Sequence, residues 1–443
     1  MHVIIVGAGQ VGSSIADSLA DSHEVIVIDI DAERVEALTY STDVLAIEGD
    51  GASLSTLREA GIEEADMVIA STDDDETNIV TCGTAKTVSD AFTIARVKNT
   101  KFLDTWHHAE GALGVDFMVG TNLLTARKIS RVIGLPAAHD VDTFGGGQVQ
   151  MAEFRIPEGS PVDGQTVQEA DRFESLTFAA VLRGEEVVVP SGATLIEAGD
   201  DVVVIGSQAS VRAFAGEVAP HANGVREVLV VGGSDIGELT ASLLEEQGLH
   251  PKLVERDPTR ARDLAEQLPG TTVLESDATD AEFLEREHVE EVDVVVAALD
   301  SDEKNLLASL LAKRLGAERA VAVVADGDYV RLFEAVGVDV AVNPREATAE
   351  EITRFTRGQQ AENVAIIETD LAEVIEIEVD DDSVLAGRPI AESMGDLPDG
   401  VVVGALTRDG QFVIPRGDTV VRAGDSAVIF VEAGVLDEAT PLL

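Results

Sequence analysis

Short apolar runs recur along the chain and are separated by polar segments with helical character. In the first 135 residues the candidate strands are HVIIVG, EVIVID, VLAIEG, MVIAS and FTIARV. The segments between them include VGSSIADSLADS, DAERVEALTYS and TNIVTCGTAKTVSD. Regular alternation of strand and helix is typical of parallel β-α-β units. The pattern therefore predicts an α/β fold with a doubly wound parallel sheet.

The same pattern occurs a second time. MHVIIVGAGQVG aligns with REVLVVGGSDIG, HEVIVIDIDAERVEAL with HPKLVERDPTRARDL, and ADMVIASTDDDETNIV with VDVVVAALDSDEKNLL. The offset stays between 225 and 227 residues throughout. A constant offset of this kind indicates a duplicated unit with small changes in its loops.

A smaller repeat follows each large unit. QVQMAEFRIPEGSPVDGQTV is similar to EVIEIEVDDDSVLAGRPI, and both continue into alternating strands with turn signals at 183–184 and 409–410. These stretches leave little room for helices, so we expect a small β-rich (α+β) lobe after each unit. The predicted domains are two Rossmann-like domains at 1–135 and 225–357, followed by lobes at 140–222 and 362–443. PHANGVRE, at 220–227, is the predicted linker between the halves.

The charge of the chain is extreme. There are 31 basic and 83 acidic residues, which gives a net charge of −52. Such a surface repels nucleic acids and anionic lipids. The acidic residues are dispersed, which is typical of adaptation to concentrated salt, where the Debye length falls to about 3 Å at 1 M. We therefore expect a halophilic source and take little functional information from the charge.

Cysteine content and hydropathy limit the class of protein. Cys82 is the only cysteine, which excludes an internal disulfide and a multi-cysteine metal site. It lies in a predicted helix among small residues, where we expect it to serve packing. We identify no signal peptide and no apolar stretch near the roughly 18 residues of a membrane span. The expectation is a cytoplasmic protein with a core of Val, Ala, Ile and Leu, since aromatic residues make up only 4%.

The first glycine turn carries the main functional signal. Gly7, Gly9 and Gly12 follow a strand and open a helix. In dinucleotide-binding folds such glycines permit the tight turn, the approach of backbone to a pyrophosphate, and close packing of helix on strand. Asp29 ends the second strand, where an acid binds ribose hydroxyls and disfavours a 2′-phosphate. A phosphate-loop NTPase is excluded, because Ser13 stands where lysine is needed.

The second copy of this turn is altered. Gly232, Gly233 and Gly237 remain and Glu255 corresponds to Asp29, but Ser234 replaces the middle glycine. Its side chain lies where backbone would approach phosphate, although serine can itself donate a hydrogen bond. Whether the second site is occupied stays open at this point.

Other polar groups favour structural roles. The neighbouring residues His107 and His108 diverge on a helix and cannot easily chelate one metal ion together. The acidic run 73–76 is interpreted as a solvated loop, and the acids of 75–76 and 302–303 as favourable charges at helix N-termini. We find no metal-binding motif and no nucleophile–base set. This absence weighs against catalysis.

The residues together resemble a known family. VGAGQVG, the acid after the second strand, EGDGAS, ASTDDDETNIV and IARVKN are similar to the RCK (or KTN) domain. The tandem arrangement over essentially the whole chain resembles the TrkA family, the peripheral cytosolic regulatory subunits of Trk potassium uptake systems. The motifs are specific because they occur twice in the same order.

The resemblance implies a set of nucleotide-binding residues. In the first unit these are Gly7, Ala8, Gly9, Gln10, Val11, Gly12, Asp29, Asp50, Gly51, Thr72, Asp73 and Arg96. In the second unit they are Gly232, Gly233, Ser234, Asp235, Ile236, Gly237, Glu255, Asp277, Ala278, Leu299 and Asp300. Asp50 corresponds to the adenine side and Arg96 to a basic residue near the phosphates. Val324 stands at the position of Arg96 in the second unit, so the second copy departs from the family pattern twice.

The resemblance also implies a regulatory role without catalysis. NAD(H), or ATP or ADP, would bind in the clefts and change the angle between units, and thereby control a membrane subunit that conducts potassium. The expected partners are a Trk-type membrane subunit and further copies of the chain, as a dimer or tetramer at the cytosolic face of the membrane. Two alternatives remain: an NAD-dependent oxidoreductase, favoured only by the glycine turn, and a regulator of another cation transporter or antiporter.

Overall fold

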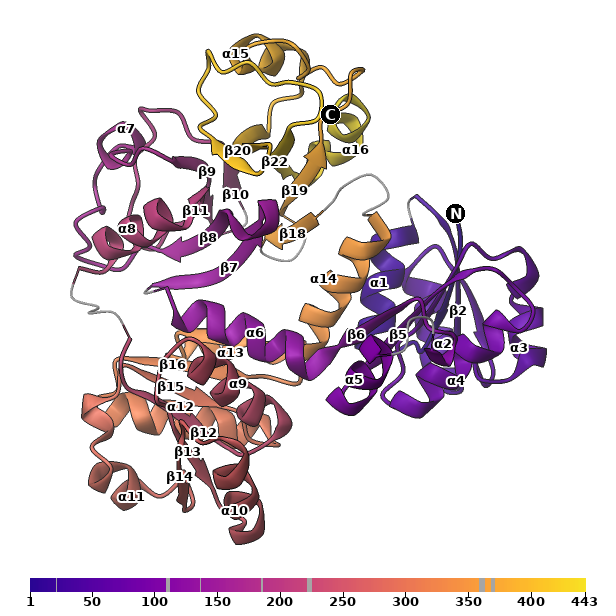
Figure 1. Cartoon of the computed structure of the whole chain (residues 1–443), viewed down its shortest axis with the longest axis horizontal. Helices are drawn as coiled ribbons and strands as arrows, with labels where there is room; N and C mark the ends of the chain where they lie inside the picture. The colour runs from indigo at the N-terminus through magenta and orange to yellow at the C-terminus, as the bar shows by residue number, and fades with distance from the viewer. Residues whose placement is uncertain are drawn as a thin grey trace. The chain divides into compact units, whose positions relative to one another are not determined.

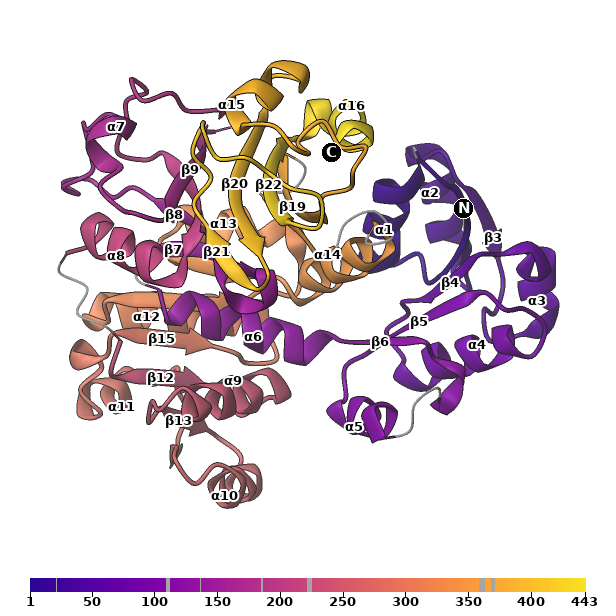
Figure 2. The same cartoon turned by 45° about the horizontal axis from the view of Figure 1, so that its top comes forward.

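The computed structural model describes residues 1–20, 22–108, 112–135, 137–184, 186–220, 225–357, 363–367 and 371–443. It contains two compact units, and each unit combines segments from both halves of the chain (Figures 1 and 2). One consists of Met1–Ser130 with Arg226–Thr353, and the other of Arg131–Val225 with Arg354–Leu443. The predicted linker includes residues 221–224, which lie outside the described residues, as do the predicted boundaries at 222 and 362.

The first part of the first unit is a six-stranded parallel sheet with strand order β3-β2-β1-β4-β5-β6. Its strands are β1 (His2–Val6), β2 (Glu24–Asp29), β3 (Leu45–Glu48), β4 (Met67–Ala70), β5 (Phe92–Val97) and β6 (Phe117–Gly120). Its helices are α1 (Gln10–Ala20), α2 (Ala32–Ser41), α3 (Leu54–Glu59), α4 (Asp75–Lys86), α5 (Thr100–His108) and α6 (Thr121–Ile133). The strands β2 and β3 extend the sheet on one side of β1, and β4, β5 and β6 extend it on the other. The point between β1 and β4 where the strand order changes direction is where ligands bind in doubly wound sheets.

The second part of the unit repeats this topology, with strand order β14-β13-β12-β15-β16-β17. Its strands are β12 (Val228–Val231), β13 (Lys252–Glu255), β14 (Thr272–Glu275), β15 (Val294–Ala297), β16 (Arg319–Val323) and β17 (Val340–Val342). Its helices are α9 (Asp235–Glu246), α10 (Pro258–Gln267), α11 (Ala281–Arg286), α12 (Asp302–Leu315), α13 (Val330–Ala335) and α14 (Pro344–Arg357). The predicted Rossmann-like duplication is confirmed. The sixth strand of each sheet was not among the predicted strands.

Aliphatic burial holds these sheets together. Val3, Ile4 and Ile5 of β1 are fully buried, and so are Val295 and Val296 of β15. Burial of an aliphatic side chain of this size stabilises the fold by roughly 1.5–3 kcal/mol. The small and β-branched residues allow helices to pack closely on both faces of a parallel sheet.

Helix α6, which follows the last strand of the first half, contacts the second half. Gln247, at the C-terminal end of α9, donates from its side-chain amide to the Ser130 hydroxyl (2.6 Å). Lys128 of α6 lies 3.7 Å from the Glu350 carboxylate of α14. Helices α6 and α14 therefore connect the two Rossmann-like halves, and both begin at the carboxyl edge of a sheet.

The second unit contains two antiparallel sheets, with strand orders β10-β9-β11-β8-β7 and β18-β19-β22-β20-β21. The first comprises β7 (Ala138–Phe144), β8 (Val149–Arg155), β9 (Leu176–Arg183), β10 (Glu186–Val188) and β11 (Asp201–Ser207). The second comprises β18 (Asn363–Ile367), β19 (Ala372–Glu378), β20 (Val401–Arg408), β21 (Gln411–Val413) and β22 (Ser426–Glu432). The helices are α7 (Val167–Ala170), α8 (Gln208–Val218), α15 (Ile390–Ser393) and α16 (Leu436–Ala439).

The two lobes share one hydrophobic core. Phe144 and Met151 of the first lobe pack in the same cluster as Val374 and Phe430 of the second. The expected β-rich character is confirmed: among the described residues of the first repeat, the short α-helix α7 and a 3-10 turn at Gly145–Gly147 lie between the strands. Helix α8 follows the last strand and packs Phe214 against the sheet through an edge contact with Phe154 (ring centroids 5.3 Å apart).

Among the described residues, no helix is both long enough and apolar enough to cross a bilayer.

Candidate functional site

The first glycine turn lies between β1 and α1, at the carboxyl edge of the sheet. Gly7 has a φ of +107°, and a Cβ on Gly12 would lie 1.8 Å from the carbonyl oxygen of Gly7. The fold itself therefore requires glycine at both positions. A Cβ on Gly9 would meet nothing closer than Arg34 Nη1, at 3.7 Å. Packing therefore does not require glycine at this position. Because Gly9 has no side chain, an approaching group can reach its backbone.

Asp29 is buried beside this turn. The backbone N–H of Ala8 donates to Asp29 Oδ2 (2.6 Å), and the N–H of Asp31 donates to Oδ1 (2.8 Å). The guanidinium of Arg34 lies 3.9 Å away. The carboxylate is thus fixed at the end of β2 with its charge compensated. A carboxylate in this position can also accept hydrogen bonds from ribose hydroxyls.

The predicted residues of the first site all lie at this edge of the sheet. Gln10, Val11 and Gly12 form the first turn of α1. Asp50 and Gly51 follow β3, and a Cβ on Gly51 would lie 2.1 Å from Val6 Cγ1. Glycine therefore lets this loop pack against β1. The Asp50 carboxylate accepts from the N–H of Ala52 (2.9 Å).

A buried asparagine joins the ends of β4 and β5. Asn78 donates to the carbonyl oxygens of Thr72 (2.9 Å) and Arg96 (2.8 Å) and accepts from the backbone N–H of Thr72 (2.9 Å). Asn305 makes the corresponding contacts with Leu299 and Val323 in the second half. Sequence reasoning missed both asparagines and treated this segment only as a helix N-terminus. Their recurrence at the same place in the repeat was a signal that could have identified them.

The acids of the run 73–76, after β4, each have different contacts, whereas the sequence suggested a solvated loop. Asp74 caps α4 by accepting from the N–H of Thr77 (2.7 Å). Asp75 accepts from the N–H groups of Lys98 and Asn99 (both 2.9 Å). Asp75 and Glu76 lie in the first turn of α4, as predicted, and 302–303 lie in the first turn of α12.

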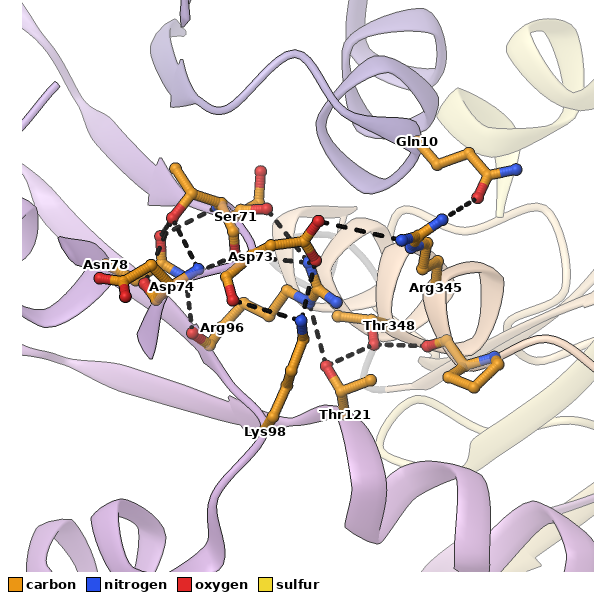
Figure 3. Close-up of polar contacts among 12 residues, drawn as sticks. Gln10, Ser71, Asp73, Asp74, Asn78, Arg96, Lys98, Thr121, Arg345 and Thr348 are labelled. Carbon is orange, nitrogen blue, oxygen red and sulfur yellow. Dashed lines mark hydrogen bonds and ion pairs between the residues drawn. The ribbon is translucent and has the colours of Figure 1, made fainter. Parts of the chain in front are cut away.

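Asp73 is paired with basic side chains rather than only with solvent (Figure 3). Arg96 Nη1 lies 3.3 Å and Lys98 Nζ 3.0 Å from Asp73 Oδ1. Partial burial raises the pKa of Asp73, but the hydrogen bond from Lys98 and the charges of Lys98, Arg96 and Arg345 outweigh it, so the pKa lies below its ordinary value. Burial lowers the pKa of the Arg96 guanidinium, and Asp73 opposes that change.

The second half of the unit contributes residues that sequence reasoning did not predict. Arg345 of α14 donates to the Gln10 side-chain oxygen (3.0 Å) and lies 3.8 Å from Asp73 Oδ2 (Figure 3). Thr348 donates to the Thr121 hydroxyl (3.0 Å), which also accepts from Arg96 Nε (3.1 Å). The alignment of GTNLLTARKI with NPREATAEEI in the repeat was the available signal, but it does not indicate which residues touch.

The second glycine turn keeps the same framework. Gly232 has a φ of +108°, and a Cβ on Gly237 would lie 2.0 Å from the carbonyl oxygen of Gly232. The Glu255 carboxylate accepts from the N–H groups of Gly233 (2.9 Å) and Asp257 (2.7 Å). The acid after the second strand is therefore held against the turn in both halves.

The second turn differs from the first because side chains of the protein bond to its backbone groups. Ser234 donates to the Ala298 carbonyl oxygen (2.6 Å) and accepts from the N–H of Gly237 (3.2 Å), which caps α9. Arg260 donates to the Gly233 carbonyl oxygen (2.9 Å) and to Glu238 (2.6 Å).

Asp235 and Glu238 place two acids in the first turn of α9, whereas the first turn of α1 has none. The remaining predicted residues of the second half lie at the expected edge. Asp277 and Ala278 follow β14, and Leu299 and Asp300 follow β15. The position of Arg96 is taken by Val323 and not, as predicted, by Val324, because Asn305 bonds to the Val323 carbonyl oxygen as Asn78 bonds to that of Arg96.

Cys82 and the histidine pair have the expected surroundings. Cys82 is buried in α4 and its thiol donates to the Ile94 carbonyl oxygen (3.4 Å). Burial raises the pKa of this thiol to about 12, so it is an unreactive packing residue. His107 and His108 end α5, and His108 Nδ1 lies 2.7 Å from the Asp104 carbonyl oxygen.

Comparisons with known proteins agree with this organisation. The TrkA-N domain model matches residues 3–119 and 228–344, and the TrkA-C domain model matches 151–218 and 374–443. The chain is 38% identical over 435 residues to the Trk system potassium uptake protein TrkA homolog of Archaeoglobus fulgidus, covering 98% of this chain and 97% of the relative. It is 35% identical to the Trk system potassium uptake protein TrkA of Halomonas elongata, with coverage of 97% and 96%.

Solved structures share the fold at lower identity. The GsuK RCK domain has a TM-score of 0.62 at 17% identity, with 99% of this chain and 95% of that chain covered. The GsuK channel bound to NAD has a TM-score of 0.62 at 19% identity, with coverage of 99% and 79%.

Proposed function

Because this chain belongs to the TrkA family, with two TrkA-N and two TrkA-C domains, we propose that it is the nucleotide-binding regulatory subunit of a Trk-type potassium uptake system. It acts at the cytosolic face of the membrane, assembled as a homo-oligomer on a membrane subunit that conducts potassium. It binds NAD(H), or ATP or ADP, and does not turn the nucleotide over. The curated relatives carry the name of this transport system.

The first glycine turn is the observation that carries the proposal. Gly9 is left bare where packing would tolerate a side chain, and the first turn of α1 contains no acid. The N–H groups and the dipole of this helix can therefore receive phosphate groups. Asp29, which accepts from the N–H of Ala8 beside this turn, would accept hydrogen bonds from a ribose. GsuK, which shares the fold, has been solved both with NAD and with ADP.

The second turn is arranged differently, and we infer that it does not hold a pyrophosphate. The Ser234 hydroxyl already accepts from the N–H of Gly237, and Arg260 bonds to the Gly233 carbonyl oxygen and to Glu238. Asp235 would repel an anion at the N-terminus of α9, whereas the charge of Glu238 is paired with Arg260. The second half then acts as a structural partner of the first.

Regulation follows from differential affinity. A nucleotide can shift the arrangement of the units only as far as it binds one arrangement more tightly than the other. Helices α6 and α14 begin at the carboxyl edges of the sheets, so a ligand bound at that edge contacts the elements that connect the halves. The membrane subunit would respond to this change.

A calorimetric titration of NADH, NAD, ATP and ADP tests nucleotide binding. Asp29→Ala is expected to weaken binding at least tenfold, because the ribose loses its acceptor. Glu33→Ala removes the same charge from an exposed position on α2 and should leave the affinities unchanged. Equal affinities of wild type and Asp29→Ala would refute the placement of the ribose.

Transport and turnover test the regulatory role. Co-expression with a Trk-type membrane subunit in cells deficient in potassium uptake should give uptake that depends on this chain and changes in Asp29→Ala. Steady oxidation of NADH by the purified protein with carbonyl substrates would instead favour an oxidoreductase. Co-purification with a different cation transporter or antiporter would reassign the partner.

A further inference from the structure

Three basic side chains converge on one carboxylate at the end of β4. Arg96 and Lys98 come from β5 and the residues that follow it, whereas Arg345 comes from α14 in the other half of the unit (Figure 3). The remaining acids of this loop are committed elsewhere, since Asp74 caps α4 and Asp75 accepts from backbone N–H groups. Asp73 is the carboxylate in direct contact with all three cations, while the charges of Asp74 and Asp75 act on Lys98 and Arg96 from farther away.

Basic side chains are scarce in this chain. Only 31 residues are basic against 83 acidic ones. The long-range field of such a protein repels an anionic ligand, and only nearby cations can compensate it at short range. A site for a nucleotide with several phosphate groups therefore requires a local cationic cluster of this kind.

The cluster lies on a defined side of the first turn. Asp29 and the loop after β3 lie on one side of β1, and Asp73 lies on the other, after β4. A nucleoside whose ribose is held by Asp29 and whose first phosphate reaches Gly9 directs further phosphates toward Asp73. A dinucleotide would direct to the same place a riboside that carries no terminal phosphate. The contact of Arg345 with Gln10 in the first turn of α1 places the guanidinium beside this path.

We propose that Arg345, carried by the second half, is a phosphate-binding residue of the first site and favours nucleoside polyphosphates over dinucleotides. The proposal rests on the function proposed above. The terminal phosphates replace Asp73 as the partner of Arg345, and a guanidinium suits them because it donates several hydrogen bonds in a fixed plane. Nucleotide bound in the first half is then held by both halves.

The attachment of Arg345 connects this contact to the rest of α14. One turn further on, Thr348 bonds to Thr121, which also holds Arg96. Both guanidinium groups at the proposed phosphate position are therefore tied to the same helix pair. In the first half, Asn122 of α6 corresponds to Arg345 of α14. Its side-chain amide lies 3.4 Å from the Asp235 carboxylate of the second turn and carries no charge. In the part of the chain that the structure describes, an arginine that reaches from one half to the glycine turn of the other is therefore present at the first turn and not at the second.

Binding of ATP, ADP, AMP and NAD to the full-length Arg345→Gln protein tests the proposal, at one constant KCl concentration. We expect the affinity for ATP to fall about tenfold, that for ADP to fall less, and those for AMP and NAD to change less than twofold. Arg345→Lys keeps the charge but loses the planar set of donors and should fall between wild type and Arg345→Gln in its affinity for ATP. Asn122→Ala, the matched change on the opposite side, should alter none of the four.

A second variant is expected to raise the affinity for ATP instead of lowering it. Asp73→Asn removes the anion that competes for the three cations and should raise the affinity for ATP severalfold. If Arg345→Gln does not fold, this variant and Arg345→Lys decide the question, and an affinity for ATP that does not rise in Asp73→Asn overturns the proposal.

The remaining outcomes separate this proposal from the function on which it rests. Unchanged affinity for ATP in folded Arg345→Gln, with binding still weakened by Asp29→Ala, would refute the role of Arg345 alone. Equal weakening of all four ligands would make Arg345 a structural residue and overturn the proposal. No effect of either substitution would refute the nucleotide site itself.

Discussion

The two Rossmann-like halves hold the same kind of acid against the same turn, yet they use the first turn of the following helix in opposite ways. Asp29 and Glu255 each accept two backbone N–H groups. In α1 no acid follows the turn, whereas α9 carries two acids and a serine cap. The comparison separates glycines that the fold needs, Gly12 and Gly237, from Gly9, which packing does not need. Under the function proposed above, the duplicated unit keeps its architecture while only one copy binds nucleotide.

We expect the largest effect, on stability, from substitutions of the glycine that both halves share at the start of the helix. Gly12→Ala and Gly237→Ala each place a Cβ about as close as 2 Å to a carbonyl oxygen of the preceding turn and should each destabilise the protein by about 3 kcal/mol. Gly9→Ala should change the free energy of unfolding by less than about 0.5 kcal/mol. Denaturant unfolding measures all three. Comparable destabilisation by Gly9→Ala would contradict the distinction.

The next effect separates the halves. Gly9→Val should weaken nucleotide binding about a hundredfold, or about 2.8 kcal/mol, because its side chain fills the space in which phosphate approaches the backbone. Ser234→Val, the same side chain at the equivalent position, should leave the affinity unchanged. Titration calorimetry with ATP and NAD measures both. A loss of binding in Ser234→Val would show that the second turn also takes nucleotide.

The cap of α9 supplies a smaller, purely structural effect. Ser234→Ala removes the acceptor for the N–H of Gly237 and the donor to Ala298 and should cost about 1 kcal/mol of stability. Nucleotide affinity should not change. Thermal unfolding followed by circular dichroism gives the stability, and an unchanged melting temperature would mean that the serine cap contributes nothing.

The smallest effect concerns pH. The pKa of Asp73 is lowered in the folded protein from an ordinary value of 3.8, so its stabilising contribution is complete above pH 3.8 and is lost as the pH falls through the folded pKa. Wild type should exceed Asp73→Asn in stability by less than about 1 kcal/mol at pH 6, since the carboxylate is partly exposed. The difference should shrink below about pH 4. A difference that grows on acidification would contradict the pairing.

The sequence was sufficient for the regular parts of the fold. Five strands of the first sheet and the duplication were predicted, because β-branched runs alternate with helices and the repeat keeps its offset. The sixth strand, Phe117–Gly120, is as short as β3 and β4, but it ends in glycine, which in a sequence pattern is typical of a loop. The first-half site residues were also placed at the correct edge, since parallel strands bring their carboxyl ends together.

Contacts between the halves could not be predicted. Arg345 and Gln10 are separated by 335 positions, and no local pattern indicates that α14 reaches the first turn. The roles within the acidic run were equally hidden, because Asp73, Asp74 and Asp75 are chemically identical and differ only in which group each one faces. Conversely, Asn78 and Asn305 recur in the repeat and could have been predicted.

The account depends most on the claim that the first half binds nucleotide and the second does not. Calorimetric titration of ATP and NAD into wild type, Asp29→Ala and Glu255→Ala measures this directly, because the two substitutions remove equivalent carboxylates from equivalent turns. The account predicts one site per chain in wild type and in Glu255→Ala, with equal affinity, and at least tenfold weaker binding in Asp29→Ala. Two sites per chain in wild type, with one lost in each variant, would contradict it.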